Sequence, residues 1–159
     1  MRKNAGFSLL ESLIVVALIA LLATLATSGG QSSLERVRVH QQRAALSKLL
    51  MLARATAITR ASPVQVDRID GQWWLLDARG APLQTANAEH ARWRGFRALP
   101  IQFSADGGAS NGSLWFCVAP FEHARGLTLS RAGRLRRSTD RNHDGVHETG
   151  AGTAIDCAR

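Results

Sequence analysis

Residues 7 to 27 read FSLLESLIVVALIALLATLAT, an almost unbroken apolar run. It follows a short leader, residues 1–6, that carries Arg2 and Lys3 and ends in glycine. A helix needs about 20 apolar residues to cross the hydrocarbon core of a bilayer, so the run predicts a membrane-spanning helix. A secretory signal peptide that is removed after Ala-Thr-Ser at residues 26–28 would share the basic start and the apolar run.

One carboxylate interrupts the apolar run, at Glu11. A carboxylate at the centre of a membrane helix costs about 3 kcal/mol, so such a residue is normally present because it has a function. A signal peptide or a plain membrane anchor gives Glu11 no role.

The segment GFSLLESLIVVALIALL, which begins at Gly6, resembles the start of type IV prepilins and pseudopilins. The resemblance implies that a prepilin peptidase cuts after Gly6 and N-methylates Phe7. It also implies that Glu11 pairs with the terminal amine of a neighbouring subunit during assembly, where two buried opposite charges satisfy each other. Loss of the leader, with Arg2 and Lys3, lowers the formal charge from +8 to +6.

The same resemblance implies a location and a set of partners. The protein is expected in the bacterial inner membrane as a single-pass subunit with a periplasmic C-terminal domain. It is then assembled with other pilin subunits into an extracellular or periplasmic pilus.

Gly29-Gly30 ends the apolar run or loosens the helix there, and helical periodicity resumes from Ser33 to about Arg60. An apolar stripe on this second part predicts packing against a sheet; the stripe comprises Val39, Leu46, Leu50, Ala53 and Ala57. The expected organisation is a leader at 1–6, a transmembrane and assembly segment at 7–30, an amphipathic continuation of the helix at 31–60 and a β-rich domain at 61–159.

Short strands with turns are expected beyond Pro63. They are VQVDRI at 64–69, QWWLLD at 72–77, LPIQFSA at 99–105, SLWFCVA at 113–119, GLTLS at 126–130 and GRLRRS at 133–138. Asp70-Gly71 between the first two predicts a hairpin. The fold class is therefore α+β and pilin-like, with a long N-terminal helix packed on an antiparallel β-sheet domain.

The stretch SRAGRLRRSTDR, residues 130 to 141, holds five arginines around an expected hairpin turn. Strand alternation directs Leu127, Leu129 and Leu135 inward and Arg134 and Arg136 to the solvated face. Gly133 suits the positive φ that such a turn requires. Charge on a solvated edge strand also prevents sheets from pairing edge to edge, which is the structural alternative.

The order of helix and strands resembles the GspH/FimT branch of the pilin-like proteins, and GRLRR matches the Gly-Arg-x-Arg pattern of FimT-type minor pilins. That resemblance implies sequence-independent binding of DNA phosphates during natural transformation. The implied contacts are Gly133, Arg134 and Arg136, with Arg137 and Arg131 beside them. The alternatives are a GspH-like pseudopilin of type II secretion and a structural minor pilin that primes filament assembly.

Four tryptophans could stack on single-stranded bases. Trp115 and one of the pair Trp73/Trp74 are expected in the core, because neighbours on a strand face opposite ways. Trp93 lies in a second basic segment with Arg92, Arg94 and Arg97 and is a candidate secondary contact.

The sequence holds two cysteines, Cys117 and Cys157. In an exported protein they are expected to form one disulfide. The run DRNHDG at 140–145 begins like a calcium loop but has Ala151 where a bidentate glutamate is needed. A plain loop is therefore expected, with weak calcium binding by Asp140, Asn142 and Asp144 as the alternative. No metal site, cofactor or catalytic group is predicted, and the enzyme class is disfavoured.

Overall fold

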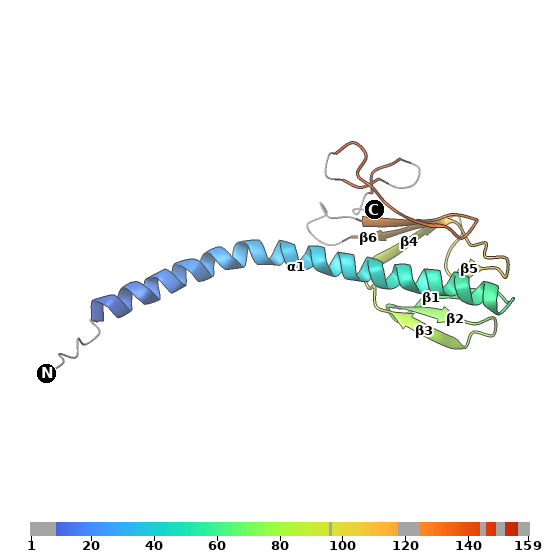
Figure 1. Cartoon of the computed structure of the whole chain (residues 1–159), viewed down its shortest axis with the longest axis horizontal. Coiled ribbons are helices and arrows are strands. Elements are labelled where there is room, and N and C mark those ends of the chain that lie inside the picture. Colours follow the sequence, from blue (N-terminus) through green and yellow to red (C-terminus); the bar gives the residue numbers. More distant parts are fainter. Residues whose placement is uncertain (1–8, 96, 118–124, 144–145, 149–151, 156–159) are drawn as a thin grey trace. The chain divides into compact units, whose positions relative to one another are not determined.

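The structure is a computed structural model that describes residues 9–95, 97–117, 125–143, 146–148 and 152–155. The chain divides into two compact units, Met1–Glu35 and Arg36–Arg159. Helix α1, Leu9–Thr59, contributes to both units (Figure 1). The first unit is described here only through its part of α1.

In the first unit α1 is continuous and Gly29-Gly30 remains helical, so the glycines do not end the helix. Glu11 lies in its first turn, where a negative charge is favourable. The sequence predicts a membrane-spanning segment at residues 7–30; within the part of the chain that the structure describes, no helix is both long enough and apolar enough to span a membrane.

In the second unit α1 buries the predicted apolar stripe. Val39, Leu46, Leu50, Ala53 and Ala57 are each at most 1% exposed, and Leu49 joins them at 3%. The helix ends with a capping arrangement in which the Ser62 amide donates to the Ala57 carbonyl (3.1 Å) and Ala61 adopts a positive φ of 46°. This arrangement satisfies carbonyls that a helix end otherwise leaves free.

Within the described residues, eight strands form two antiparallel sheets, whereas the sequence predicted one sheet. The first sheet has the order β3-β2-β1-β5, with β1 at Val64–Ile69, β2 at Gln72–Leu76, β3 at Pro82–Ala86 and β5 at Ile101–Phe103. The second has the order β4-β6-β7-β8, with β4 at Ala91–Gly95, β6 at Gly112–Phe116, β7 at Arg125–Leu129 and β8 at Leu135–Arg137. Strands β3 and β4 were not predicted.

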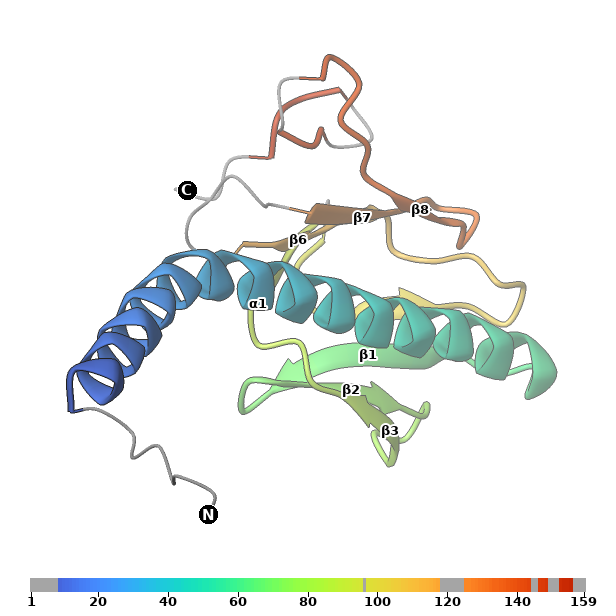
Figure 2. The same ribbon diagram turned by 60° about the vertical axis from the view of Figure 1, so that its left-hand side comes forward.

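One core joins the helix stripe to the inner faces of both sheets. Figure 2 shows β1 to β3 on one side of this part of α1 and β6 to β8 on the other. Trp73 is fully buried while Trp74 is half-buried, as predicted for the pair. Trp115 is also buried, but in a separate small cluster with Ile155 and Cys117 on the outer face of the second sheet.

The predicted hairpins form. Asp70 and Gly71 both have positive φ (51° and 81°) and connect β1 to β2, as the Asp-Gly pair predicts. Between β7 and β8 the Ser130 amide donates to the Arg134 carbonyl (3.0 Å), and the Gly133 amide donates to the Ser130 carbonyl (2.9 Å).

Gly133 has the predicted positive φ (66°), but the stronger constraint is space. A Cβ atom there would lie 2.1 Å from the Gly107 carbonyl oxygen and 2.8 Å from Arg54 Nε. Arg54 Nε itself donates to that carbonyl (3.1 Å). The turn between β7 and β8 therefore rests on the 104–108 loop and on α1, and only glycine fits at the contact.

We expect Gly133→Ala to lower the free energy of unfolding by about 3 kcal/mol or more, because overpacking adds to the cost of a positive φ. Gly71→Ala is the matched control, since Gly71 has φ 81° and no atom within 4 Å of the added Cβ. It should cost about 1 kcal/mol. Urea unfolding of residues 36–159 measures both, and equal losses would contradict the close contact.

Candidate nucleic-acid interface

The arginine turn, defined as residues 130–137, ends in β8, which is an edge strand of the second sheet. Arg131, Arg134, Arg136 and Arg137 are all exposed, as predicted. Leu135 is half-buried and packs against the core. The segment therefore presents four guanidinium groups, two from the turn and two from the short strand β8.

The strand register divides these arginines between two faces. Arg136 lies opposite Thr128, whose side of the sheet faces away from the core. Arg137 lies opposite Leu127, which is buried in the core at 1% exposure. Residues directly opposite in an antiparallel pair share a face, so Arg137 belongs to the helix side of β8 and Arg136 to the outer face. Although the two positions start from opposite faces of β8, Arg136 and Arg137 both line one hollow beside the turn.

Two shallow hollows border the turn. The outer groove, about 580 Å³, has Ser113, Thr128, Arg131 and Arg136 among its lining residues. The helix-side groove, about 520 Å³, lies against α1 and is lined partly by Arg54, Arg134 and Arg136. Arg136 therefore borders both hollows, whereas Arg134 borders only the helix-side groove among these two.

The carboxylate nearest to the outer groove is already engaged. Glu148 lines the groove but is buried, and its Oε2 accepts a hydrogen bond from the Arg141 amide (2.9 Å). Its backbone also bridges Thr139 and Ala154. The remaining charged side chains that line the groove are arginines, and the hydroxyls of Ser113 and Thr128 lie 3.4 Å apart between them. This lining suits an anion.

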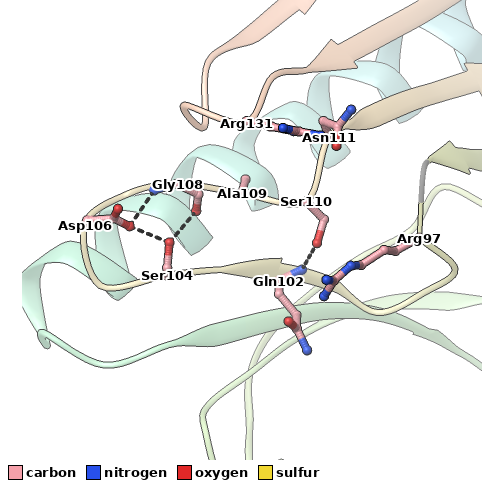
Figure 3. Close-up of a pocket in the computed structure, with 9 residues that line it drawn as sticks. All are labelled: Arg97, Gln102, Ser104, Asp106, Gly108, Ala109, Ser110, Asn111 and Arg131. Atoms are coloured by element: carbon pink, nitrogen blue, oxygen red, sulfur yellow. Dashed lines mark hydrogen bonds between the residues drawn. The ribbon is translucent and has the colours of Figure 1, made fainter.

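A third hollow, about 430 Å³, lies beside the 104–111 loop and shares Arg131 with the outer groove. Figure 3 shows Arg97 extending toward Ser110 and Gln102 across it. Asp106 also lines it and accepts hydrogen bonds from the Ser104 hydroxyl and the Gly108 amide (3.0 Å to the amide). The bond from Ser104 and then that from Gly108 lower the pKa of Asp106, so this hollow keeps a negative charge.

The second basic segment forms β4. Arg92 and Arg94 are exposed on it, and Arg94 lies over the Trp115 ring at 4.9 Å from the centroid. Trp93 points the other way: it packs against the core, and its Nε1 donates to the Arg97 carbonyl (2.9 Å). Trp93 is thus held within the fold, and the arginines beside it form the exposed surface.

A separate group of cations lies where α1 meets the ends of β7 and β8. We call it the cationic junction; it consists of His40, Arg43, Arg125, Arg137 and His147. Arg43 Nη2 lies 3.1 Å from His40 Nδ1. Desolvation, followed by repulsion from Arg137 and Arg125, lowers the pKa of the Arg43 guanidinium. Sequence reasoning found none of this, because the members come from four separate segments.

The folded structure lowers the pKa of both histidines of the cationic junction. Desolvation, followed by repulsion from Arg43, lowers the pKa of His40. Desolvation and repulsion from Arg125 also lower the pKa of His147, although its bond with Ser138 and the charge of Asp140 act in the opposite sense. His147 Nδ1 lies 3.0 Å from the Ser138 carbonyl oxygen. The folded state therefore favours neutral histidines here.

Several predicted site residues lie outside the described residues, namely Gly6, Phe7 and Cys157. Cys117 is disulfide-bonded, and its pairing with Cys157 stays a prediction. In the 140–145 loop Asp140 and Asn142 are described and Asp144 is not. Glu148, the ninth position of that loop, is committed to the Arg141 amide.

Comparison with known proteins agrees with this architecture. The sequence profile described as Type II transport protein GspH matches residues 42–133, and the prokaryotic N-terminal methylation motif matches residues 1–27. Two crystal structures of the type IV minor pilin FimU of Pseudomonas aeruginosa share the fold, with TM-scores of 0.52 and 0.50 at 17% and 18% identity. They cover 69% and 65% of this chain and 91% of theirs.

The minor pseudopilin EpsH of the Vibrio cholerae type 2 secretion system matches with a TM-score of 0.45 and 19% identity, over 61% of this chain and 94% of its own. Among curated proteins no match was found.

A methylation motif followed by a long helix packed on antiparallel sheets defines a protein of the minor pilin and pseudopilin class. The GspH profile spans more than half of the sequence, and the chain belongs to the GspH family. Minor pilins and pseudopilins assemble with other pilin subunits in a pilus or pseudopilus.

Because the folded state lowers the pKa of His147, the unfolded chain binds the proton first as pH falls. We expect the free energy of unfolding to be greatest above about pH 7 and to decrease as pH drops below the ordinary histidine value of about 6.5. His147→Gln should make this decrease shallower, whereas the same change at exposed His143 should not. Urea unfolding across this pH range measures the slopes, and identical slopes for wild type and His147→Gln would contradict the expectation.

Proposed function

We propose that this protein is a minor type IV pilin of the FimT kind that binds extracellular DNA through the arginine turn during natural transformation. The observation that carries the proposal is the helix-side groove. Of the described residues that line it, three are arginines, Arg54, Arg134 and Arg136, and none is a carboxylate. Arg136 is exposed on the edge strand β8, and Arg134 is exposed in the turn directly before it.

The proposed mechanism is contact with phosphate. Each guanidinium that meets a phosphate displaces condensed counterions, so binding is independent of sequence and weakens as salt increases. Arginine suits this task because its planar fork can give two hydrogen bonds to one phosphate. Lys3 and Lys48 are the only lysines among 20 basic residues. Arg131 and Arg137 line the outer groove and add positive charge beside the same ligand.

Assembly is proposed to follow the pilin route. A prepilin peptidase cuts after Gly6 and methylates Phe7, and Glu11 then pairs with the amine of a neighbouring subunit. The match of the methylation motif to residues 1–27 supports this route. The subunit waits in the inner membrane with its C-terminal part in the periplasm. There Cys117 and Cys157 form the disulfide that an oxidising compartment permits.

A role in type II secretion is the second candidate. The family description, Type II transport protein GspH, favours it directly. Such a subunit would meet other pseudopilins and exported proteins and would have no need of a salt-sensitive polyanion site. A structural minor pilin that primes filament assembly would use the same basic surface to meet acidic partner subunits.

The arginine turn separates these candidates experimentally. We expect the full chain in a non-ionic detergent to bind a fluorescently labelled DNA duplex with an affinity that falls as salt rises. Arg134→Ala/Arg136→Ala should weaken binding sharply and reduce the slope of log affinity against log salt by about 2, because two phosphate contacts are lost. Fluorescence anisotropy across a salt series measures both quantities.

The matched control is Arg60→Ala/Arg79→Ala, which removes the same charge from exposed positions outside the turn. If both double variants weaken binding equally, net charge and not the turn is responsible. Failure of the wild-type protein to bind DNA even at low salt would favour the secretion role. Tight binding to another pilin that survives the Arg134→Ala/Arg136→Ala change would favour the priming role.

A further inference from the structure

The strand register builds one straight row of side chains across the second sheet. Arg94 on β4 lies opposite Ser113 on β6, and Ser113 lies opposite Thr128 on β7. Thr128 in turn lies opposite Arg136 on β8. We call these four residues the cross-strand row. It has an arginine at each end and two hydroxyls in the middle.

The row lies on the outer face. Directly opposite residues share a face, and the neighbours of the row along β6 and β7, Leu114 and Leu127, are buried in the core at 0% and 1% exposure. Because successive strand residues alternate, the row points away from that core. Three strand spacings of about 4.8 Å separate its ends, so the row extends the arginine turn by about 14 Å.

The Arg94 end of the row is preorganised. The guanidinium of Arg94 lies 4.9 Å from the centroid of the Trp115 ring, and Trp115 is itself only 8% exposed. Stacking on a fixed ring reduces the freedom that a long side chain loses on binding and leaves the N–H groups at its edge able to donate. Arg94 remains exposed in this position.

The middle of the row suits phosphate oxygens. Ser113 and Thr128 are half-buried, and their hydroxyl oxygens lie 3.4 Å apart within the outer groove. Hydroxyls donate to phosphate without adding charge.

Bases are not the target of this face. Trp115 is covered, and Trp93 faces the core side and donates to the Arg97 carbonyl. Among the described residues of β4, β6, β7 and β8, no aromatic ring is exposed on the outer face for a base to stack on. The ligand that fits is the sugar–phosphate backbone.

We infer that the DNA site does not end at the arginine turn: a nucleic-acid backbone crosses the outer face of the second sheet along the cross-strand row, and Arg94 gives it a further phosphate contact at the far end of the row. This inference rests on the proposed function. It assigns a positioning surface to β4, a strand that ends at Gly95, well before the turn begins at residue 130.

Arg94→Ala in the full chain, in non-ionic detergent, tests the inference against the labelled duplex. Loss of one charge-assisted contact should weaken binding about tenfold at low salt and lower the slope of log affinity against log salt by about 1. Arg79→Ala removes one exposed charge from the other sheet and should leave both quantities near the wild-type values. Ser113→Ala/Thr128→Val should weaken binding about threefold without changing the slope, because no charge is removed.

Arg94→Lys keeps the positive charge but removes the planar guanidinium that stacks on Trp115, so it separates the effect of charge from the effect of the stacked group. It should recover the slope but only part of the affinity. If Arg94→Ala and Arg79→Ala behave alike while Arg134→Ala/Arg136→Ala abolishes binding, the row is overturned and the turn alone is the site. If the wild-type protein does not bind the duplex, the proposed function and the row both fail. Near-ultraviolet circular dichroism of each variant confirms that Trp115 keeps its surroundings.

Discussion

The burial of one apolar stripe of α1 against two sheets is the interaction on which the rest of the second unit depends. Val39, Leu46 and Leu50 have almost no exposed surface, and both sheets supply the residues that cover them. The hydrophobic effect stabilises the folded state by about 25 cal/mol for each Å² of apolar surface that is buried. Once one face of a sheet is committed to the helix, strand alternation assigns every other residue to the opposite face.

The alternation along each strand also decides on which face the arginines of β8 lie. In β7 and β8 the core takes Leu127, Leu129 and Leu135, which leaves Arg136 on the outer face and directs Arg137 to the helix side. The two sets of cations then differ in character. The outward arginines are exposed, whereas the cationic junction brings half-buried Arg43, Arg125 and His147 close together beside exposed His40. The first set costs the fold little, and the second opposes it.

The sequence predicted the elements whose pattern is local. The buried helix stripe, the Asp70-Gly71 hairpin and the inward leucines of β7 and β8 are all as expected. Strand β3 was missed because PLQTA begins with proline and contains a single large apolar residue, and β4 because ARWRG places arginines on both sides of its tryptophan. Neither has the clean apolar alternation by which a strand is recognised.

What could not be predicted depends on pairing between distant segments. The positive φ of Gly133 was expected, but the approach of the Gly107 carbonyl to it requires the 104–108 loop in place. Arg94 was seen as part of a basic segment, but only the register across four strands aligns it with Arg136. The membrane and assembly residues at the start of the chain, Gly6 and Phe7, stay predictions from resemblance.

Because of the histidines of the cationic junction, acid affects the stability of this protein but not the charge of its exposed arginines. Arginine keeps its charge at every pH at which proteins fold, so acid does not discharge the surface that faces solvent. Protonation of His147 instead adds a further cation beside Arg125. Acid therefore lowers the stability of the folded subunit without lowering the charge of its surface. Neighbouring subunits that bind only the folded form would lower the pH at which the subunit unfolds. A filament would therefore be more stable in acid than the free subunit.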